Sequence, residues 1–160
     1  MQNKELTIRR AEEFDMPTIN KLLFQVNQVH SDLRPDLFKS GAKKYTDQEL
    51  KGILNDPKTP VFVAERDGSV LGYAFCIHKQ FINDSNMTDI KTLYIDDLCV
   101  DETVRGAQIG QALYRYVVDY AKSCGCYNLT LNVWAGNERA INFYEKAGLK
   151  VQKTGMETIL

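Results

Sequence analysis

The stretch best equipped for chemistry lies where a strand-like segment meets a helix-like segment. An apolar run ends at Val100, and Asp101–Gln111 (DETVRGAQIGQ) leads into a pattern of helical spacing. The first amides of a helix have no partner within it, and the helix dipole adds about half a positive charge there, so this junction can bind phosphate. Gly106 allows close approach of the backbone, and Arg105 can add a charge-assisted hydrogen bond. The segment therefore predicts a site for a diphosphate.

The glycine spacing excludes two common phosphate-binding motifs. A P-loop needs Gly-Lys-Ser/Thr at the helix start, where this chain has Ile109-Gly110-Gln111. A dinucleotide fingerprint needs three glycines in G-x-G-x-x-G order, and only Gly106 and Gly110 are present. Taken alone, the segment also fits a plain strand-to-helix turn.

A second segment, Leu129–Leu149 (LTLNVWAGNERAINFYEKAGL), favours the binding site over the plain turn. Asn137 is an N-cap for a last helix, and Ala140, Phe143 and Tyr144 lie on one side of it. The two segments resemble the GNAT superfamily of N-acetyltransferases. Its acetyl-CoA signature is a strand, R-G-x-G-x-G/A and a helix, followed by a strand and N-x-x-A-x-x-F-Y-x-x-x-G-F/L. The match is close from about residue 93 to 149, and the order of elements upstream also fits.

The resemblance implies one GNAT domain over residues 1–160 that uses acetyl-CoA as its co-substrate. The backbone of the central strand would pair with the pantetheine arm and the acetyl carbonyl, the amides of the loop would hold the pyrophosphate, and the last helix would complete the site. The cofactor-binding residues so implied are Leu98, Cys99, Val100, Arg105, Gly106, Ala107, Gln108, Ile109, Gly110, Gln111, Asn137, Ala140 and Tyr144. Gln108 departs from the family, which usually has glycine or alanine there, and we expect its side chain to face solvent.

Tyr144 matches the family tyrosine whose phenol reaches the cofactor sulfur. A phenol with a pKa near 10 can protonate a thiolate with a pKa of about 8.5 if the two lie close together. Asp96 and Asp97 are the next candidates, because carboxylates in a covered strand need a partner or a purpose. Alternation places them on opposite faces, and Asp96 on the face of Leu98 and Val100.

The string Leu93–Val100, together with residues 137–140, is similar to the diamine (spermidine/spermine) acetyltransferase branch. In that branch the acidic residue matching Asp96 faces the substrate amine, so Asp96 is predicted to attract the amine or act as a base through water. The alternative is a structural carboxylate that caps loop amides. Other predicted acceptor contacts are Asp97, His30, Arg34, Phe38 and Trp134, although a lone histidine or a Pro-Asp turn is more often structural.

The acceptor expected from these residues is a primary amine of a small molecule or polyamine, attacking the thioester directly. A protein or peptide amine is the alternative acceptor. A non-catalytic acyl-CoA-binding module with the same fold is an alternative of a different functional class. No cysteine stands in a recognisable nucleophile–base pair, which argues against an acetyl-enzyme. The resemblance also admits a homodimer, to which a C-terminal strand could contribute an edge.

Strands and helices that alternate along the chain must position these residues. Strands are predicted at 6–10, 60–66, 70–79, 92–100, 128–133 and 151–160, and helices at 16–30, 46–55, 109–123 and 138–147. In the strand at 92–100, alternation puts Leu93, Ile95 and Cys99 on one face and Tyr94, Leu98 and Val100 on the other. We therefore expect a mixed α/β fold, with one sheet of six to seven strands flanked by about four helices.

Composition narrows the class further. The 160 residues are 44% hydrophobic and 26% charged, typical of one globular domain. With 20 Lys+Arg against 21 Asp+Glu, no basic excess points to nucleic acid. No apolar run approaches the ~20 residues of a membrane helix, and no secretory signal begins the chain, so a cytoplasmic location is expected. Cys124-Gly125-Cys126 lacks metal-site spacing, so no metal is expected.

Overall fold

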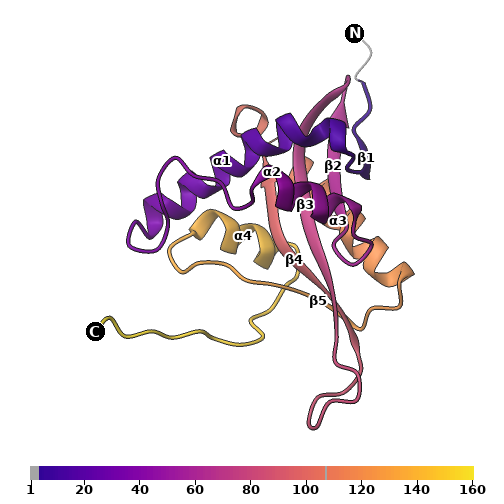
Figure 1. Cartoon of the computed structure of the whole chain (residues 1–160), viewed down its shortest axis with the longest axis vertical. Helices are drawn as coiled ribbons and strands as arrows, with labels where there is room; N and C mark the ends of the chain where they lie inside the picture. The colour runs from indigo at the N-terminus through magenta and orange to yellow at the C-terminus, as the bar shows by residue number, and fades with distance from the viewer. Residues whose placement is uncertain (1–3, 107) are drawn as a thin grey trace.

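The computed structural model describes residues 4–106 and 108–160, and within them one mixed sheet forms the centre of the molecule (Figure 1). Its strands follow the order β1-β2-β3-β4-β5, and neighbours run antiparallel except β4 and β5, which run parallel. The strand bounds are β1 Thr7–Arg10, β2 Val61–Arg66, β3 Ser69–Gln80, β4 Lys91–Val100 and β5 Asn128–Leu131.

Helices cover both faces of this sheet. α1 (Met16–Leu33) and α2 (Asp47–Asn55) lie on one face and α3 (Ile109–Ser123) lies on the other (Figure 1). α4 (Glu138–Lys146) contacts the start of α3, where Phe143 meets Gly110. Each face has its own core. Ile19, Leu22, Leu23 and Leu50 pack on one side with the sheet, whereas Ile109, Leu113, Val117 and Ala121 pack on the other. Two short 3-10 helices, Glu13–Asp15 and Glu102–Val104, precede α1 and α3.

The expected mixed α/β fold with four helices is confirmed for the described residues, but the strand count is wrong. These residues form five strands, not six to seven. The predicted strand at 151–160 is an extended, exposed tail without a strand partner in the described structure. Sequence pattern predicts extended backbone there, whereas a strand also needs a neighbour to bond. The strand predicted at 128–133 ends at Leu131.

The predicted faces of β4 are also wrong in its second half. The β3–β4 register pairs Phe75 with Asp97 but Cys76 with Ile95, so Asp96 is an extra residue in β4, a β-bulge. The bulge resets the alternation of side chains. Leu98 therefore joins Leu93 and Ile95 in the α3 core, while Cys99 lies in the α1 core; Asp96 does not share the face of Leu98.

β3 and β4 approach closely where Gly72 lies opposite Val100. A Cβ on Gly72 would lie 2.8 Å from the carbonyl oxygen of Cys99 and 3.1 Å from Cδ1 of Leu113. No side chain fits in this space without a shift of backbone. Gly72 thus lets α3 pack tightly against the end of β4. From there residues 101–108, called the anion loop below, connect β4 to α3.

Candidate active site

The second half of β4 has one open edge. β5 pairs only with Thr92–Ile95, through Asn128–Leu131, whereas β3 continues beside β4 as far as Val100. In the described residues no strand therefore covers the β5-side edge of Asp96–Val100. Backbone N–H and C=O groups on such an edge are free to bond an extended ligand. Leu98, Cys99 and Val100, predicted to meet the pantetheine arm, all belong to this open stretch.

The anion loop leads from this open stretch to the N-terminus of α3. Gly106 has φ +88° and Gln108 has φ +61°, so the backbone turns sharply through the left-handed region before α3 begins at Ile109. The amides of Ile109, Gly110 and Gln111 start the helix and have no intrahelical acceptor. The side chains of Arg105 and Gln108 are exposed, as expected for Gln108. Ala107 lies outside the described residues.

Asp101 fastens the start of this loop to α1. Its carboxylate accepts hydrogen bonds from the amide and hydroxyl of Thr103, at 3.1 and 3.0 Å, and from Gln25 at 3.4 Å, and it pairs with Lys21 at 3.3 Å. The Gln25 oxygen in turn accepts the Glu102 amide at 3.2 Å. Hydrogen bonds from Thr103 hold the pKa of Asp101 below its usual range, against the effect of burial.

Helix α4 places Tyr144 within electrostatic range of Asp97 in β4. Asn137 caps α4 as predicted, since its side-chain oxygen accepts the Ala140 amide at 3.2 Å. Phe143 packs close to Gly110, where a Cβ would lie 3.3 Å from its ring, so Gly110 serves the contact between α3 and α4. Tyr114 and Phe143 flank the Tyr144 ring at centroid distances of 6.3 and 5.1 Å.

Asp97 is the carboxylate whose charge affects the pKa of Tyr144. It accepts a hydrogen bond from the buried Tyr73 hydroxyl at 2.7 Å. Burial raises the pKa of Asp97 to about 6, although the hydrogen bond from Tyr73 by itself lowers that pKa. Burial, and then the charge of Asp97, raise the pKa of Tyr144 well above 10. Tyr144 is therefore protonated at neutral pH, while Asp97 is mostly ionised.

Asp96 is engaged by the segment that precedes α2. Lys44 Nζ lies 2.7 Å from its carboxylate, and the Tyr45 hydroxyl donates a hydrogen bond to the same oxygen. The Tyr45 ring stacks on Phe75 of β3, and burial together with the Asp96 hydrogen bond raises the pKa of Tyr45 far above 10. In the described structure Asp96 thus ties this segment to the bulge.

The predicted acceptor residues outside β4 form one aromatic group at the end of α1. His30 packs on Phe38 at 5.1 Å between centroids, Phe38 meets Trp134 edge-on at 5.5 Å, and the Arg34 guanidinium lies 5.9 Å from the Trp134 ring. Burial, and then the charge of Lys44, lower the pKa of His30, so it is neutral at pH 7. Arg34 pairs with Asp36 at 2.8 Å and with Glu157 of the tail at 2.5 Å.

Sequence reasoning missed five residues that shape this site: Lys44, Tyr45, Tyr73, Asp101 and Glu157. Only Asp101 had a local signal, because an acidic residue directly after a strand and two positions before a threonine is a usual cap of a short turn. The other four act across separations of 24 to 123 residues, for which one sequence holds no periodic signal.

The buried thiols near the site are poor nucleophiles. Burial raises the pKa of Cys99 and of Cys76 to about 12, so both stay protonated at neutral pH. Cys99 also directs its sulfur toward the Leu22 carbonyl, 3.8 Å away in the α1 core. These two cysteines are thus packing residues.

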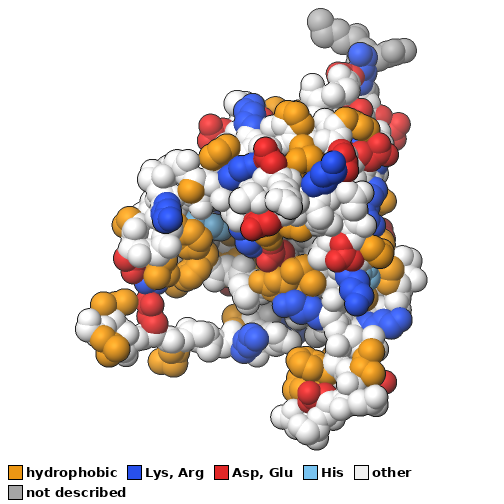
Figure 2. Space-filling view, in the orientation of Figure 1, with side chains coloured by type: hydrophobic (Ala, Val, Ile, Leu, Met, Phe, Trp, Pro, Cys, Tyr) orange, Lys and Arg blue, Asp and Glu red, His pale blue; other side chains and the backbone are white. Residues whose placement is uncertain are grey.

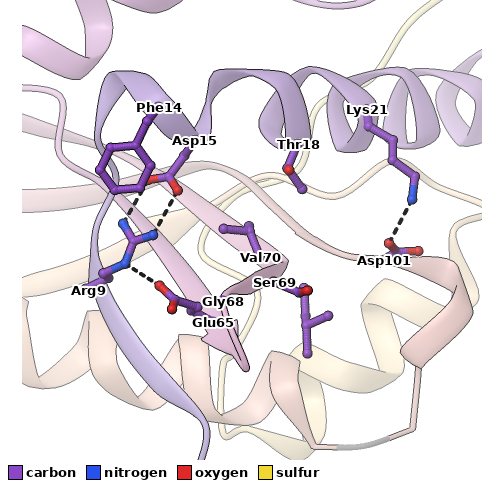
Figure 3. A pocket seen from close by; sticks show the side chains of 11 residues that line it. Arg9, Phe14, Asp15, Thr18, Lys21, Glu65, Gly68, Ser69, Val70 and Asp101 are labelled. Atoms are coloured by element: carbon purple, nitrogen blue, oxygen red, sulfur yellow. Dashed lines mark hydrogen bonds and ion pairs between the residues drawn. The ribbon is translucent and has the colours of Figure 1, made fainter.

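A pocket of about 720 Å³ lies away from Tyr144, between the start of α1 and the β2–β3 turn (Figure 3). Arg9 binds both oxygens of Asp15 at 2.8 Å and Glu65 at 2.7 Å there. Asp15 stands at the predicted N-cap of α1, yet its side chain makes no cap bond and bonds Arg9 and the Glu12 amide instead. These bonds outweigh burial and leave the pKa of Asp15 below its usual value. Since its charges are paired, this pocket is a structural joint between β1, β2 and α1.

Comparison with known proteins agrees with this geometry. A model of the acetyltransferase (GNAT) family matches residues 26–149. The chain belongs to this family of acyltransferases. The crystal structure of a tetramutant of the BH1408 protein from Bacillus halodurans superposes with a TM-score of 0.91 at 32% identity, covering 96% of this chain and 99% of that one.

Two N-acetyltransferases are similar to this chain in sequence. A glucosamine 6-phosphate N-acetyltransferase of Trypanosoma brucei brucei is 30% identical over 154 residues, which are 95% of this chain and 94% of that protein. An uncharacterized N-acetyltransferase of Methanocaldococcus jannaschii is 27% identical over 147 residues, which are 92% of this chain but only 62% of that protein.

Two further properties concern only the part of the chain that the structure describes. None of its helices is both long enough and apolar enough to cross a membrane. No group of three or more His, Cys, Asp or Glu side chains is arranged to hold a metal ion.

Proposed function

We propose that this GNAT protein transfers the acetyl group of acetyl-CoA directly to a primary amine of a small molecule. The observation that carries the proposal is the open edge of Asp96–Val100, which leads to the N-terminus of α3 and contains Asp97, whose charge reaches Tyr144 on α4. An open strand edge fits the amide-bearing pantetheine arm, and the first amides of α3 with Arg105 fit the diphosphate.

Tyr144 and Asp97 carry the two proton transfers of the proposed reaction. The amine nitrogen attacks the thioester carbon, the C–S bond breaks, and the thiolate takes the proton of the Tyr144 phenol. The proton lost by the attacking nitrogen passes to Asp97, through a water molecule where the two do not touch. With a pKa of about 6, Asp97 is ionised at pH 7 and still basic enough to accept that proton.

These two proton transfers support one another. The negative charge of Asp97 is one reason why the pKa of Tyr144 is raised. When Asp97 receives the proton of the amine, that charge is neutralised, and the pKa of Tyr144 falls towards its ordinary value. Tyr144 therefore becomes a stronger acid at the moment when the thiolate needs a proton.

Asp96 contributes attraction for the amine and order in the acceptor segment. Its ion pair with Lys44 and its hydrogen bond from Tyr45 hold residues 44 and 45 against the bulge. A cationic acceptor can compete with Lys44 for this carboxylate. The aromatic group of His30, Phe38 and Trp134 would then enclose the body of the acceptor.

An amino sugar phosphate is the second candidate acceptor. The relative from Trypanosoma brucei brucei favours it, because the similarity extends over 94% of that protein. A phosphate needs cations, and the acceptor side offers Arg34 and Lys44. Both are already paired, Arg34 with Asp36 and Glu157 and Lys44 with Asp96, so this acceptor would have to break ion pairs on binding.

The test follows thiol release from acetyl-CoA across polyamines, amino sugars with and without a 6-phosphate, aminoglycosides and N-terminal peptides. Release with polyamines or unphosphorylated amines supports the main proposal. Release that requires the 6-phosphate would support an amino sugar phosphate as the acceptor instead, and release with peptides alone would point to a protein acceptor. Binding of acetyl-CoA without any transfer would instead indicate the non-catalytic module.

A further inference from the structure

Lys44 places a primary amine of the chain itself beside the carboxylate that the acceptor amine is proposed to meet. Its Nζ lies 2.7 Å from a carboxylate oxygen of Asp96, and Asp96 has no other ion pair among the described residues. The Asp96 side chain is 14% exposed, whereas that of Lys44 is 45% exposed. A flexible lysine therefore reaches a carboxylate that is held in the sheet.

The segment that carries Lys44 is anchored on the sheet and on α2. The Tyr45 hydroxyl donates a hydrogen bond to the same oxygen of Asp96. The next residue, Thr46, is the N-cap of α2, and its hydroxyl oxygen accepts the Glu49 amide at 3.2 Å. The backbone on the C-terminal side of Lys44 is thus fixed, and the lysine side chain is the part that can move.

The neighbouring lysine is directed elsewhere. Lys43 bonds a side-chain oxygen of Asn20 in α1 at 2.8 Å and pairs with Asp47 in α2. Figure 2 shows acidic and basic side chains mixed over α1 and α2 on this face, so carboxylates are available to a lysine there. Lys44 instead reaches Asp96, 52 positions later in the chain. Two adjacent lysines therefore serve different parts of the molecule.

The charge of Lys44 also reaches the proposed base and the aromatic group. Burial raises the pKa of Asp97, and the hydrogen bond from Tyr73 and then the charge of Lys44 act against that rise. The same charge, after burial, lowers the pKa of His30. The Lys44 amine thus lies among the carboxylate proposed to attract an amine, the base proposed to take its proton and the wall proposed to enclose it.

We propose that Lys44 is an acceptor built into the chain, which the site acetylates on Nζ when no substrate amine is bound. The inference rests on the proposed function, because it uses the same site and the same two proton transfers. Acetylation removes the charge of Lys44 and with it the ion pair to Asp96. The carboxylate is then open to a cationic acceptor.

The transfer to Lys44 follows the steps proposed for a free amine. The ammonium first releases one proton to solvent, as any protonated acceptor must. The neutral nitrogen attacks the thioester carbon, the C–S bond breaks, and the thiolate takes the proton of Tyr144. The nitrogen passes one of its two protons to Asp97, which returns it to Tyr144 through water. The products are N-acetyl-lysine and the free thiol of CoA.

The first experiment incubates the full chain with acetyl-CoA and no other amine, and follows each lysine by peptide mass spectrometry. Lys44 should gain one acetyl group about 10²-fold faster than Lys43, which reacts only by uncatalysed transfer. The rate per chain should not change with protein concentration, because the reaction occurs within one chain. Equal rates at the two lysines overturn the proposal, and so does a rate that rises with protein concentration.

The second experiment removes the ion pair. Asp96→Asn should slow acetylation of Lys44 and leave that of Lys43 unchanged, since only Lys44 is held by this carboxylate. A substrate amine in excess should likewise protect Lys44 in the wild type. Acetylation of Lys44 at the wild-type rate in Asp96→Asn would refute the proposal.

The same samples separate this inference from the proposed function. Thiol release with an added amine, while Lys44 stays unmodified in the absence of that amine, overturns the inference and keeps the proposed function. Acetylation of Lys44 without transfer to any added amine supports the inference and overturns the small-molecule acceptor. Absence of transfer both to Lys44 and to every added amine overturns both.

Discussion

In the first half of β4, Thr92–Ile95 is bonded to a strand on both edges, whereas the second half, Asp96–Val100, is bonded to a strand on one edge only. In the first half Leu93 and Ile95 are buried and no carboxylate is present. The second half begins with a bulge and two adjacent carboxylates. The comparison teaches that the proposed chemistry begins where the β-ladder to β5 ends, because only there are backbone groups and charges left for a ligand.

Asp96 and Asp97 repeat this contrast on a smaller scale. Asp96 is bonded by Lys44 and Tyr45, which lie 52 and 51 positions earlier in the chain, and it orders a loop. Asp97 is bonded by Tyr73 within the sheet and acts on Tyr144. Adjacent residues in one strand thus serve different parts of the site, and mutations can separate them.

The largest expected effect comes from Tyr144→Phe. Removal of the phenol removes the proton donor for the thiolate, so kcat should fall by about 10²- to 10⁴-fold. The ring remains, so the KM for acetyl-CoA should change by less than about twofold. Steady-state kinetics measures both. Tyr114→Phe, a neighbour in the same aromatic cluster, is the control and should retain activity; an equal loss in both variants would refute the acid role.

The second prediction separates the two carboxylates. Asp97→Asn should lower kcat/KM by about 10- to 100-fold at pH 8 and abolish the acid limb of the pH profile. In the wild type this limb should lie near pH 6, because protonation of Asp97 below its pKa of about 6 removes the base. Asp96→Asn should keep the limb and chiefly raise the acceptor KM. The reverse pattern would assign the base to Asp96.

The stability of the same Asp97→Asn variant provides an independent check. The folded pKa of Asp97 is raised above the unfolded value, so the wild type loses stability as pH rises from about 4 through 6. The neutral amide that replaces the carboxylate does not titrate and carries no such cost. The free energy of unfolding of the variant relative to the wild type should therefore increase over that window. Urea titrations at pH 4 and 7 measure it, and a constant difference would contradict the raised pKa.

A smaller effect on acetyl-CoA binding is expected from Gln25, which holds the residues that directly follow β4. Gln25→Ala removes two hydrogen bonds that tie Asp101 and Glu102 to α1, each worth about 1 kcal/mol. The KM for acetyl-CoA should rise by about three- to tenfold with kcat nearly unchanged. Gln28→Ala on the same helix, where Gln28 bonds only exposed partners, is the control. A fall in kcat alone would contradict this positioning role.

The smallest effect is expected at Gln108. Its left-handed φ of +61° is unfavourable for a residue with a side chain, by about 1 kcal/mol, and glycine adopts it freely. Gln108→Gly should therefore change the free energy of unfolding by less than about 1 kcal/mol and leave acetyl-CoA affinity intact. Denaturant titration and calorimetry measure these quantities. A large loss of affinity would show that the Gln108 side chain contacts the ligand.

Much of the cofactor half could be predicted from local sequence. The bounds of α3 are those expected from its helical spacing, the N-cap role of Asn137 is confirmed, and the family is the one that the two motifs indicate. These features depend on residues a few positions apart. Helical periodicity, caps and turn glycines therefore carry enough information to predict them.

The acceptor half was decided by tertiary structure. Only the register of β4 against β3 makes Asp96 a bulge residue, which brings Asp97 rather than Asp96 into the field of Tyr144. The contact of Asp96 with Tyr45 spans 51 positions, and that of Arg34 with Glu157 spans 123. A single extra residue reverses every later side-chain face in a strand, and local spacing cannot reveal it, because strand register is chosen by packing between distant segments.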